Sequence, residues 1–291
     1  MRKIHIYVYQ CFIVFYFPNS KTAQSHARSA LENCISQIST WMSINRLKLN
    51  SVKTEFVILG TRQQLAKMEY DSISIAGEVI KTKSCVRNLG VYMYAELRMN
   101  EHVQHVVRIC FGKIREIASF RKYLTQDVTQ TLVQAVIISH IDYANSLLYG
   151  ISQHLIDKLQ RVQNAAARLI LGYKKHESIS PGLFKLHWLP VKYRIQCKIV
   201  TITFKILSTN EPSYLRSLLT VQESTRTRRT NHLIIPRSRL KTAGDRSFSV
   251  SAPKIWNSLP DTVRNAQSLL VFKKNLKTFY FRRANSHFLS K

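Results

Sequence analysis

The sequence predicts an α+β protein in which one helix and short antiparallel strands precede a mainly helical region. Apolar residues alternate with polar ones between residues 72 and 93, which is typical of short strands joined by tight turns. From about residue 101 the apolar spacing becomes three and four, which indicates helices that each bury one face. A hydrophobic fraction of 45% supports a sizeable core, and 291 residues are enough for roughly two domains.

The first hundred residues combine one helix with several short strands. Residues 21–45 predict an amphipathic helix, and Glu55–Leu59 predicts a strand that Gly60 ends. Ala76-Gly77 is a turn signal between the strands that follow. The apolar face expected for the helix consists of Ala27, Leu31, Cys34, Ile38, Trp41 and Met42.

The next part of the chain predicts consecutive helices. The first begins near residue 101. Asp127 fits the N-cap of the second, which is expected to run to Leu148. Ser152 and Gly172 mark the start and the end of a third.

The last third is less regular. A turn at His187–Pro190 precedes another predicted helix, and residues 221–251 predict a basic loop or a set of short strands. Ser268–Phe281 predicts a final helix with lysines on its outer face. Its inner face is expected to contain Leu269, Leu270, Phe272, Leu276, Phe279 and Tyr280.

Charge is the most unusual property of the chain. Its 44 Lys and Arg oppose 16 Asp and Glu, which gives a net charge of +28 at pH 7. Such a surface repels itself unless an anion neutralises it, and nucleic acid is the expected partner because phosphate contacts release counterions. The alternative is a basic protein that binds polyanions without a dedicated role. The basic residues expected to bind nucleic acid are Arg226, Arg228, Arg229, Arg237, Arg239, Lys241, Arg246, Lys273, Lys274 and Lys277.

Aromatic residues lie among these basic ones. Tyr193, Phe248 and Trp256 can stack on unpaired bases, which is one common way to hold single strands. The other interpretation is core packing, which we favour for Trp188 and Trp256.

The cysteines and histidines do not predict a metal site. The five cysteines are widely spaced, odd in number and without a C-x-x-C pair, so neither a disulfide framework nor a zinc site is expected. His102 and His105 are interpreted as solvated helix residues. A reducing intracellular compartment, nuclear or cytoplasmic, fits this cysteine usage.

The apolar start of the sequence, Met1–Phe17, superficially resembles a signal peptide. His5 and Gln10 interrupt it, no small-residue cleavage site follows, and it is too short to span a membrane as a helix. We therefore expect a buried strand there and no membrane partner.

Several stretches resemble, in the same order, the end of the reverse transcriptase of LINE-type (non-LTR) retrotransposons, a jockey-like RNA-directed DNA polymerase. The resemblance covers about residues 20–285, and its last two stretches are the most distinctive. The stretches are Trp41-Met42 with Asn45–Asn50 and Lys53–Glu55; Asn88–Val91; Ser139–Tyr143; Leu159-Gln160 with Gln163–Arg168; Leu186–Val191; and Arg246–Phe248 with Ala252–Pro260.

This resemblance implies a remnant of the polymerase palm over residues 1–100, a helical thumb over 101–175 and a basic C-terminal region over 176–291. Lys53 falls where the family carries a palm lysine proposed to protonate departing pyrophosphate. The alternative for Lys53 is a solvated lysine at a strand start. Leu89, Gly90 and Val91 resemble the primer grip, where a glycine permits close approach of the backbone, or they form a plain turn.

The acids that polymerase chemistry requires are not in this sequence. Two Mg²⁺ ions about 3.5–4 Å apart are held by carboxylates, and the family's Tyr/Phe-x-Asp-Asp turn would stand shortly before residue 20. The sequence has no Asp-Asp and no Asp-x-Asp, and its first aspartate is Asp71. We therefore expect no complete catalytic set and no cofactor in this chain, although Mg²⁺ would be expected for the complete enzyme. No small-molecule site is evident either.

Three interpretations follow from these observations. The chain is a C-terminal fragment that binds a template–primer without catalysis by itself, or a truncated version of an active reverse transcriptase, or a decayed open reading frame with no selected function. The sequence does not distinguish RNA from DNA as the ligand, and it does not give the oligomeric state.

Overall fold

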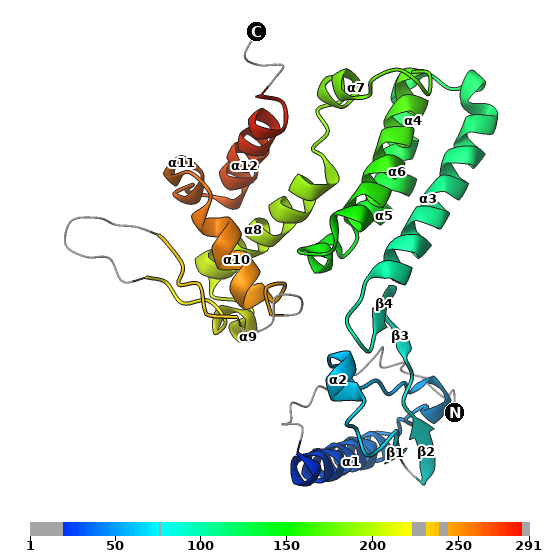
Figure 1. Cartoon of the computed structure of the whole chain (residues 1–291), viewed down its shortest axis with the longest axis vertical. Coiled ribbons are helices and arrows are strands. Elements are labelled where there is room, and N and C mark those ends of the chain that lie inside the picture. The colour runs from blue at the N-terminus through cyan, green and yellow to red at the C-terminus, as the bar shows by residue number, and fades with distance from the viewer. Residues whose placement is uncertain (1–19, 76, 223–230, 239–243, 287–291) are drawn as a thin grey trace. The chain divides into compact units, whose positions relative to one another are not determined.

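The computed structural model has an α+β architecture, as predicted, with two small antiparallel sheets and many helices (Figure 1). The chain divides into two compact units, of which the first ends at Met99 and the second begins at Asn100. The boundary expected near residue 175 falls inside the second unit. The structure describes residues 20–75, 77–222, 231–238 and 244–286, so the strand predicted over Met1–Phe17 lies outside the described residues.

The first unit is built on a long helix. Ser20 caps this helix, α1, by accepting a hydrogen bond from the N–H of Ala23 at 3.4 Å, and α1 packs on β1 through the buried Ile35. The helix agrees with the predicted one, and Leu31 of its expected apolar face packs against the core, but Trp41 is 59% exposed. The elements are α1 (Lys21–Ile44), η1 (Ser51–Lys53), α2 (Arg62–Leu65), β1 (Ser72–Ile75), β2 (Glu78–Lys81), β3 (Cys85–Asn88) and β4 (Val91–Tyr94).

Two hairpins confirm the strands predicted between residues 72 and 93. In the first, Ile75 of β1 pairs with Glu78 of β2. In the second, β3 and β4 are joined by Leu89 and Gly90, whose φ angles are +45° and +83°. Positive φ at both central residues is the backbone of a type I′ turn, which matches the twist of the flanking strands.

The prediction of a strand over Glu55–Leu59 is wrong. Only Phe56 pairs, in a single bridge to Thr82, and Phe56 accepts a hydrogen bond from the N–H of Lys83 at 2.8 Å. The apolar pattern instead reflects burial, because Phe56 packs against the core formed by Ile35, Ile73 and Ile75.

The second unit is helical. α3 packs along α6, and α8 packs against both α10 and α12 (Figure 1). The elements are α3 (Asn100–Phe120), η2 (Arg121–Tyr123), α4 (Gln126–Val133), η3 (Gln134–Ile138), α5 (Ser139–Asp142), η4 (Asn145–Leu148), α6 (Gln153–Leu171), α7 (Ser180–Lys185), α8 (Val191–Thr209), α9 (Ser213–Arg216), α10 (Phe248–Asn257), α11 (Asp261–Arg264) and α12 (Leu269–Ala284).

The helix predicted from Asp127 to Leu148 differs from the observed one at both ends. Its N-cap is Thr125, whose hydroxyl accepts a hydrogen bond from the N–H of Val128 at 3.3 Å. Asp127 lies in the first turn, where a carboxylate is favoured by the helix dipole. The helix ends at α5, because Ala144 adopts a left-handed backbone with φ +49°.

Other helix predictions are mostly confirmed. α6 follows Ser152 and ends at Gly172, whose φ of +71° gives the left-handed cap that favours glycine. α12 begins after Ser268, although Leu270 is 80% exposed and not on the inner face. His102 is buried, contrary to the prediction, and burial lowers the pKa of its imidazole.

The helix α10 was not predicted, and it contributes to an aromatic core. Trp256 is 2% exposed, and Phe204 of α8 and Phe272 of α12 stack beside it with their own ring centroids 4.3 Å apart. The indole N–H of Trp256 donates to the carbonyl oxygen of Asn231 at 2.7 Å. Trp256 is therefore a core residue, as favoured above, and is not available for base stacking.

Candidate nucleic-acid interface

A groove of about 630 Å³ lies in the second unit, between α8, α12, α5 and the turn before α8. Lys198 of α8 and Lys273 and Lys277 of α12 line it. The two α12 lysines are four residues apart and therefore lie on the same face of the helix. The groove thus gathers exposed cations from two helices that are distant in sequence.

The two long helices that border this groove, α8 and α12, carry no acidic residue of their own. α8 contains Lys192, Arg194, Lys198 and Lys205 without any Asp or Glu, and α12 is likewise free of acids. No acid within either helix therefore offsets these cations. Lys274, next to Lys273, is also exposed but does not line the groove.

Among the described residues that line the groove, Asp142 is the one acid. Arg194 binds it through two hydrogen bonds, of which the Nε–Oδ1 bond measures 2.8 Å. The amide of Asn145 also donates to Asp142 Oδ1, at 3.3 Å. This pairing neutralises the carboxylate, so the lysines determine the net charge of the groove.

The turn Leu186–Pro190 forms one wall of the groove. α7 ends in a Schellman motif, because the N–H of His187 donates to the carbonyl of Phe184 at 3.0 Å and the N–H of Trp188 donates to that of Leu183 at 2.9 Å. His187 occupies the left-handed position usually taken by glycine, with φ +50°. As a result Trp188 is buried, as favoured from the sequence, and His187 is exposed.

The exposed imidazole of His187 lies beside an aromatic side chain from α12. The ring centroids of His187 and Phe281 are 5.3 Å apart, with an interplanar angle of 37°. Phe281 is one helical turn beyond Lys277. An aromatic surface and a cation are thereby brought to the same side of the groove.

Cys197 also lines the groove, but it is not a reactive nucleophile. Burial raises the pKa of its thiol to about 12, with the charge of Arg194 acting in the opposite direction. At about pH 8 roughly one thiol in 10⁴ is then ionised. We expect iodoacetamide to leave Cys197 unmodified in the folded chain and to modify it after unfolding in guanidinium chloride, as measured by peptide mass mapping. Rapid modification of the folded chain would contradict this assignment.

The residues that the resemblance likens to parts of a polymerase palm lie in the first unit. Lys53 is exposed at the end of η1, and its backbone N–H donates to Asn50 Oδ1 at 3.1 Å. Leu89 and Gly90 form the β3–β4 turn, with Leu89 68% exposed, while Val91 is buried at the start of β4. The positions of these residues do not test the roles that the resemblance implies. Those roles and the plainer alternatives, a solvated lysine and a plain turn, therefore stay predictions.

Arg246, expected to bind nucleic acid, makes contacts within the protein. Its guanidinium donates to the carbonyl oxygens of Tyr149 and Leu147, each at 3.2 Å, and burial lowers its pKa. Gly150 leaves room for it, because a Cβ there would lie 2.7 Å from Arg246 Cγ. Arg246 thus joins the start of α10 to the segment before α6.

The other basic residues predicted to bind nucleic acid are either exposed in the structure or outside the described residues. Lys273, Lys274 and Lys277 are exposed on α12, and Arg237 is exposed after the bridge between Val221 and Leu233. The remaining ones lie outside the described residues: Arg226, Arg228, Arg229, Arg239 and Lys241.

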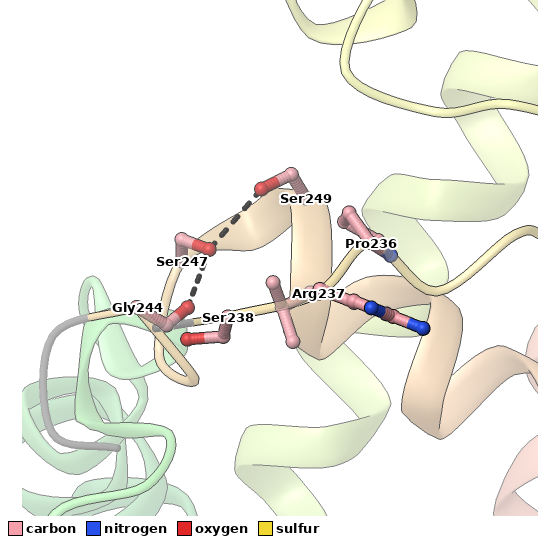
Figure 2. A pocket seen from close by; sticks show the side chains of 7 residues that line it. Pro236, Arg237, Ser238, Gly244, Ser247 and Ser249 are labelled. Carbon is pink, nitrogen blue, oxygen red and sulfur yellow. Dashed lines mark hydrogen bonds between the residues drawn. The ribbon is translucent and has the colours of Figure 1, made fainter. Parts of the chain in front are cut away.

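Arg237 lines a smaller depression of about 280 Å³ (Figure 2). Ser247 shapes it by donating to the carbonyl of Gly244 at 2.7 Å and by a 3.1 Å hydrogen bond with Ser249. Figure 2 shows the Arg237 side chain extending away from these serines. This depression therefore does not gather a cluster of cations.

Of the aromatic residues predicted to stack on bases, Tyr193 packs internally. Its ring lies 5.2 Å from that of the buried Tyr280. His187 was not among the residues predicted to stack on bases. Its exposure depends on the Schellman turn, and its position beside Phe281 depends on tertiary packing.

Among the described residues, no three or more His, Cys, Asp and Glu side chains cluster closely enough to hold a metal ion. Within the same ranges, no helix combines the length and apolar character needed to cross a membrane. Comparison of the chain with known protein families, with curated proteins and with solved structures found no match.

Proposed function

We propose that this chain binds nucleic acid through the second unit, without polymerase catalysis of its own. The observation that carries the proposal is the groove between α8 and α12, which is bordered by two helices that bear several cations and no acids. Its lysines can neutralise phosphates and release counterions, and this is the dominant source of affinity in such complexes.

The origin of the chain is part of the same proposal. The ordered resemblance to LINE-type reverse transcriptases supports a role at the region that follows the catalytic palm, where the template–primer is held. The absence of Asp-Asp and Asp-x-Asp from the sequence leaves no carboxylate pair of the kind that holds two Mg²⁺ ions. Template–primer binding is therefore proposed, and nucleotide transfer is not.

The salt dependence of binding tests this proposal. We expect the full chain to bind an RNA or a single-stranded DNA of mixed sequence. Its affinity should fall by at least about 15-fold between about 50 and about 200 mM KCl, because three or more phosphates of a single strand are neutralised. Fluorescence anisotropy of a labelled oligonucleotide measures this.

Two outcomes would contradict the proposal. An affinity that does not change with salt would exclude phosphate neutralisation as the basis of binding. Template-dependent incorporation of nucleotides by this chain with Mg²⁺ would show that it has catalytic activity of its own.

A further inference from the structure

The groove brings together two kinds of group that recognise an unpaired nucleotide. His187 offers an exposed ring that Phe281 supports at 5.3 Å between centroids. Lys277 and Lys273 extend from the same helix as Phe281, one and two turns away from it. Stacking surfaces next to cations are how proteins hold single strands without reading their sequence.

The volume of the groove is compatible with one nucleotide. About 630 Å³ is within the range of pockets that enclose small ligands. The base pairs of a duplex are stacked on each other, so a base can enter such a groove only when it is unpaired. By shape, a single strand can therefore place a base in the groove and an intact duplex cannot.

We propose that this groove binds one unpaired nucleotide of a single strand, with its base against His187 and its phosphates near Lys273 and Lys277. The inference rests on the proposed nucleic-acid binding and adds the class of ligand and the residues that hold it. Lys198, on the opposite helix, neutralises the next phosphate. The paired Asp142 and Arg194 border the ligand without adding net charge.

The lysines on α12 provide a test with a matched control. Lys273→Gln with Lys277→Gln is expected to lower the affinity for an oligothymidylate of about ten nucleotides by about 20-fold, because two phosphate contacts are lost. Lys274→Gln removes the same charge from the same helix but outside the groove. Its effect is expected to be about twofold. Equal effects of Lys274→Gln and Lys277→Gln would overturn the groove assignment while leaving salt-dependent binding intact.

The role of His187 is tested by removing the ring and the base separately. His187→Gly is expected to weaken binding of the oligothymidylate about tenfold, because one base loses its stacking partner. The same substitution should change the affinity for a fully abasic oligomer by less than about twofold. Glycine suits the left-handed backbone at this position, so the thermal unfolding midpoint should not fall by more than a few degrees.

Three outcomes would overturn the inference. His187→Gly could weaken the normal and the abasic oligomers equally, which would exclude stacking. A duplex of the same length could bind as tightly as the single strand and with the same dependence on His187. A poly-glutamate peptide could bind with that dependence instead, which would indicate an acidic protein partner.

Discussion

Trp256→Ala is expected to lower the free energy of unfolding of the second unit by about 4 kcal/mol. The side chain is 2% exposed and packs with Phe204 and Phe272, at ring-centroid distances of 6.5 and 5.9 Å. Truncation leaves a cavity between α8, α10 and α12. It also removes the donor to the Asn231 carbonyl oxygen. Urea unfolding followed by far-ultraviolet circular dichroism measures the change.

Two further variants separate the causes of this loss. Trp256→Phe keeps an aromatic ring but not the indole N–H, so a smaller loss of about 1–2 kcal/mol is expected. Leu270→Ala removes a large apolar side chain from the same unit at a position that is 80% exposed, and its effect should stay within about 0.5 kcal/mol. If Trp256→Ala cost no more than Leu270→Ala, the packing described for α10 would be incorrect.

Local sequence signals predicted the elements whose causes are local. The β3–β4 hairpin turns at Leu89-Gly90, where a glycine accepts positive φ, and α6 begins after Ser152 and ends at Gly172. Each of these signals acts within a few residues along the chain. They therefore remain valid whatever the rest of the molecule does.

Elements that depend on distant partners were not predicted correctly. Glu55–Leu59 has the composition of a strand, but only Phe56 meets a partner, at Thr82. α10 contains Pro253, which weakens a helix prediction, yet burial of Trp256 between α8 and α12 compensates. Tertiary packing, which no window of sequence records, decided both cases.

The candidate site shows the same contrast between features with local causes and features that depend on tertiary packing. Lys273 and Lys277 were predicted because lysines on the outer face of a helix are exposed whatever the helix packs against. Arg246 has the same charge, but its guanidinium is used by the carbonyls of Leu147 and Tyr149. Composition counts both kinds of cation equally, and only the folded chain separates those that face solvent from those that join segments.

A hydrogen-bond network joins two of the stretches that resemble LINE-type reverse transcriptases, the one in α6 and the one before α8. Gln163 of α6 is fully buried, and its amide N–H donates to the carbonyl oxygen of Leu189 at 2.9 Å. Its own carbonyl oxygen accepts a hydrogen bond from Gln160 at 2.9 Å. Gln160 in turn accepts from the N–H of Val191, at 2.9 Å, where α8 begins. Glutamines three residues apart on α6 therefore fix the turn that presents His187.

Gln163→Leu is expected to lower the free energy of unfolding by about 2–3 kcal/mol. Leucine has a similar volume, so the loss comes mainly from the Leu189 carbonyl, which is left buried without its donor. Gln153→Leu is the matched control, because Gln153 lies on the same helix but is exposed. Its hydrogen bond to Asp157 at 2.8 Å is a surface contact, so its loss should cost no more than about 0.5 kcal/mol.

The Gln163→Leu variant also tests whether the Leu189–Val191 turn affects ligand binding. At a temperature where the Gln163→Leu variant remains folded, loosening of the Leu189–Val191 turn should displace His187 and weaken binding of the oligothymidylate. The affinity for the abasic oligomer should change little, because the lysines of α12 do not depend on this turn. A variant that loses stability but keeps full affinity for the base-bearing oligomer would show that Gln163 supports the fold alone. It would then follow that the position of His187 is set by its contact with Phe281 and not by the network beneath it.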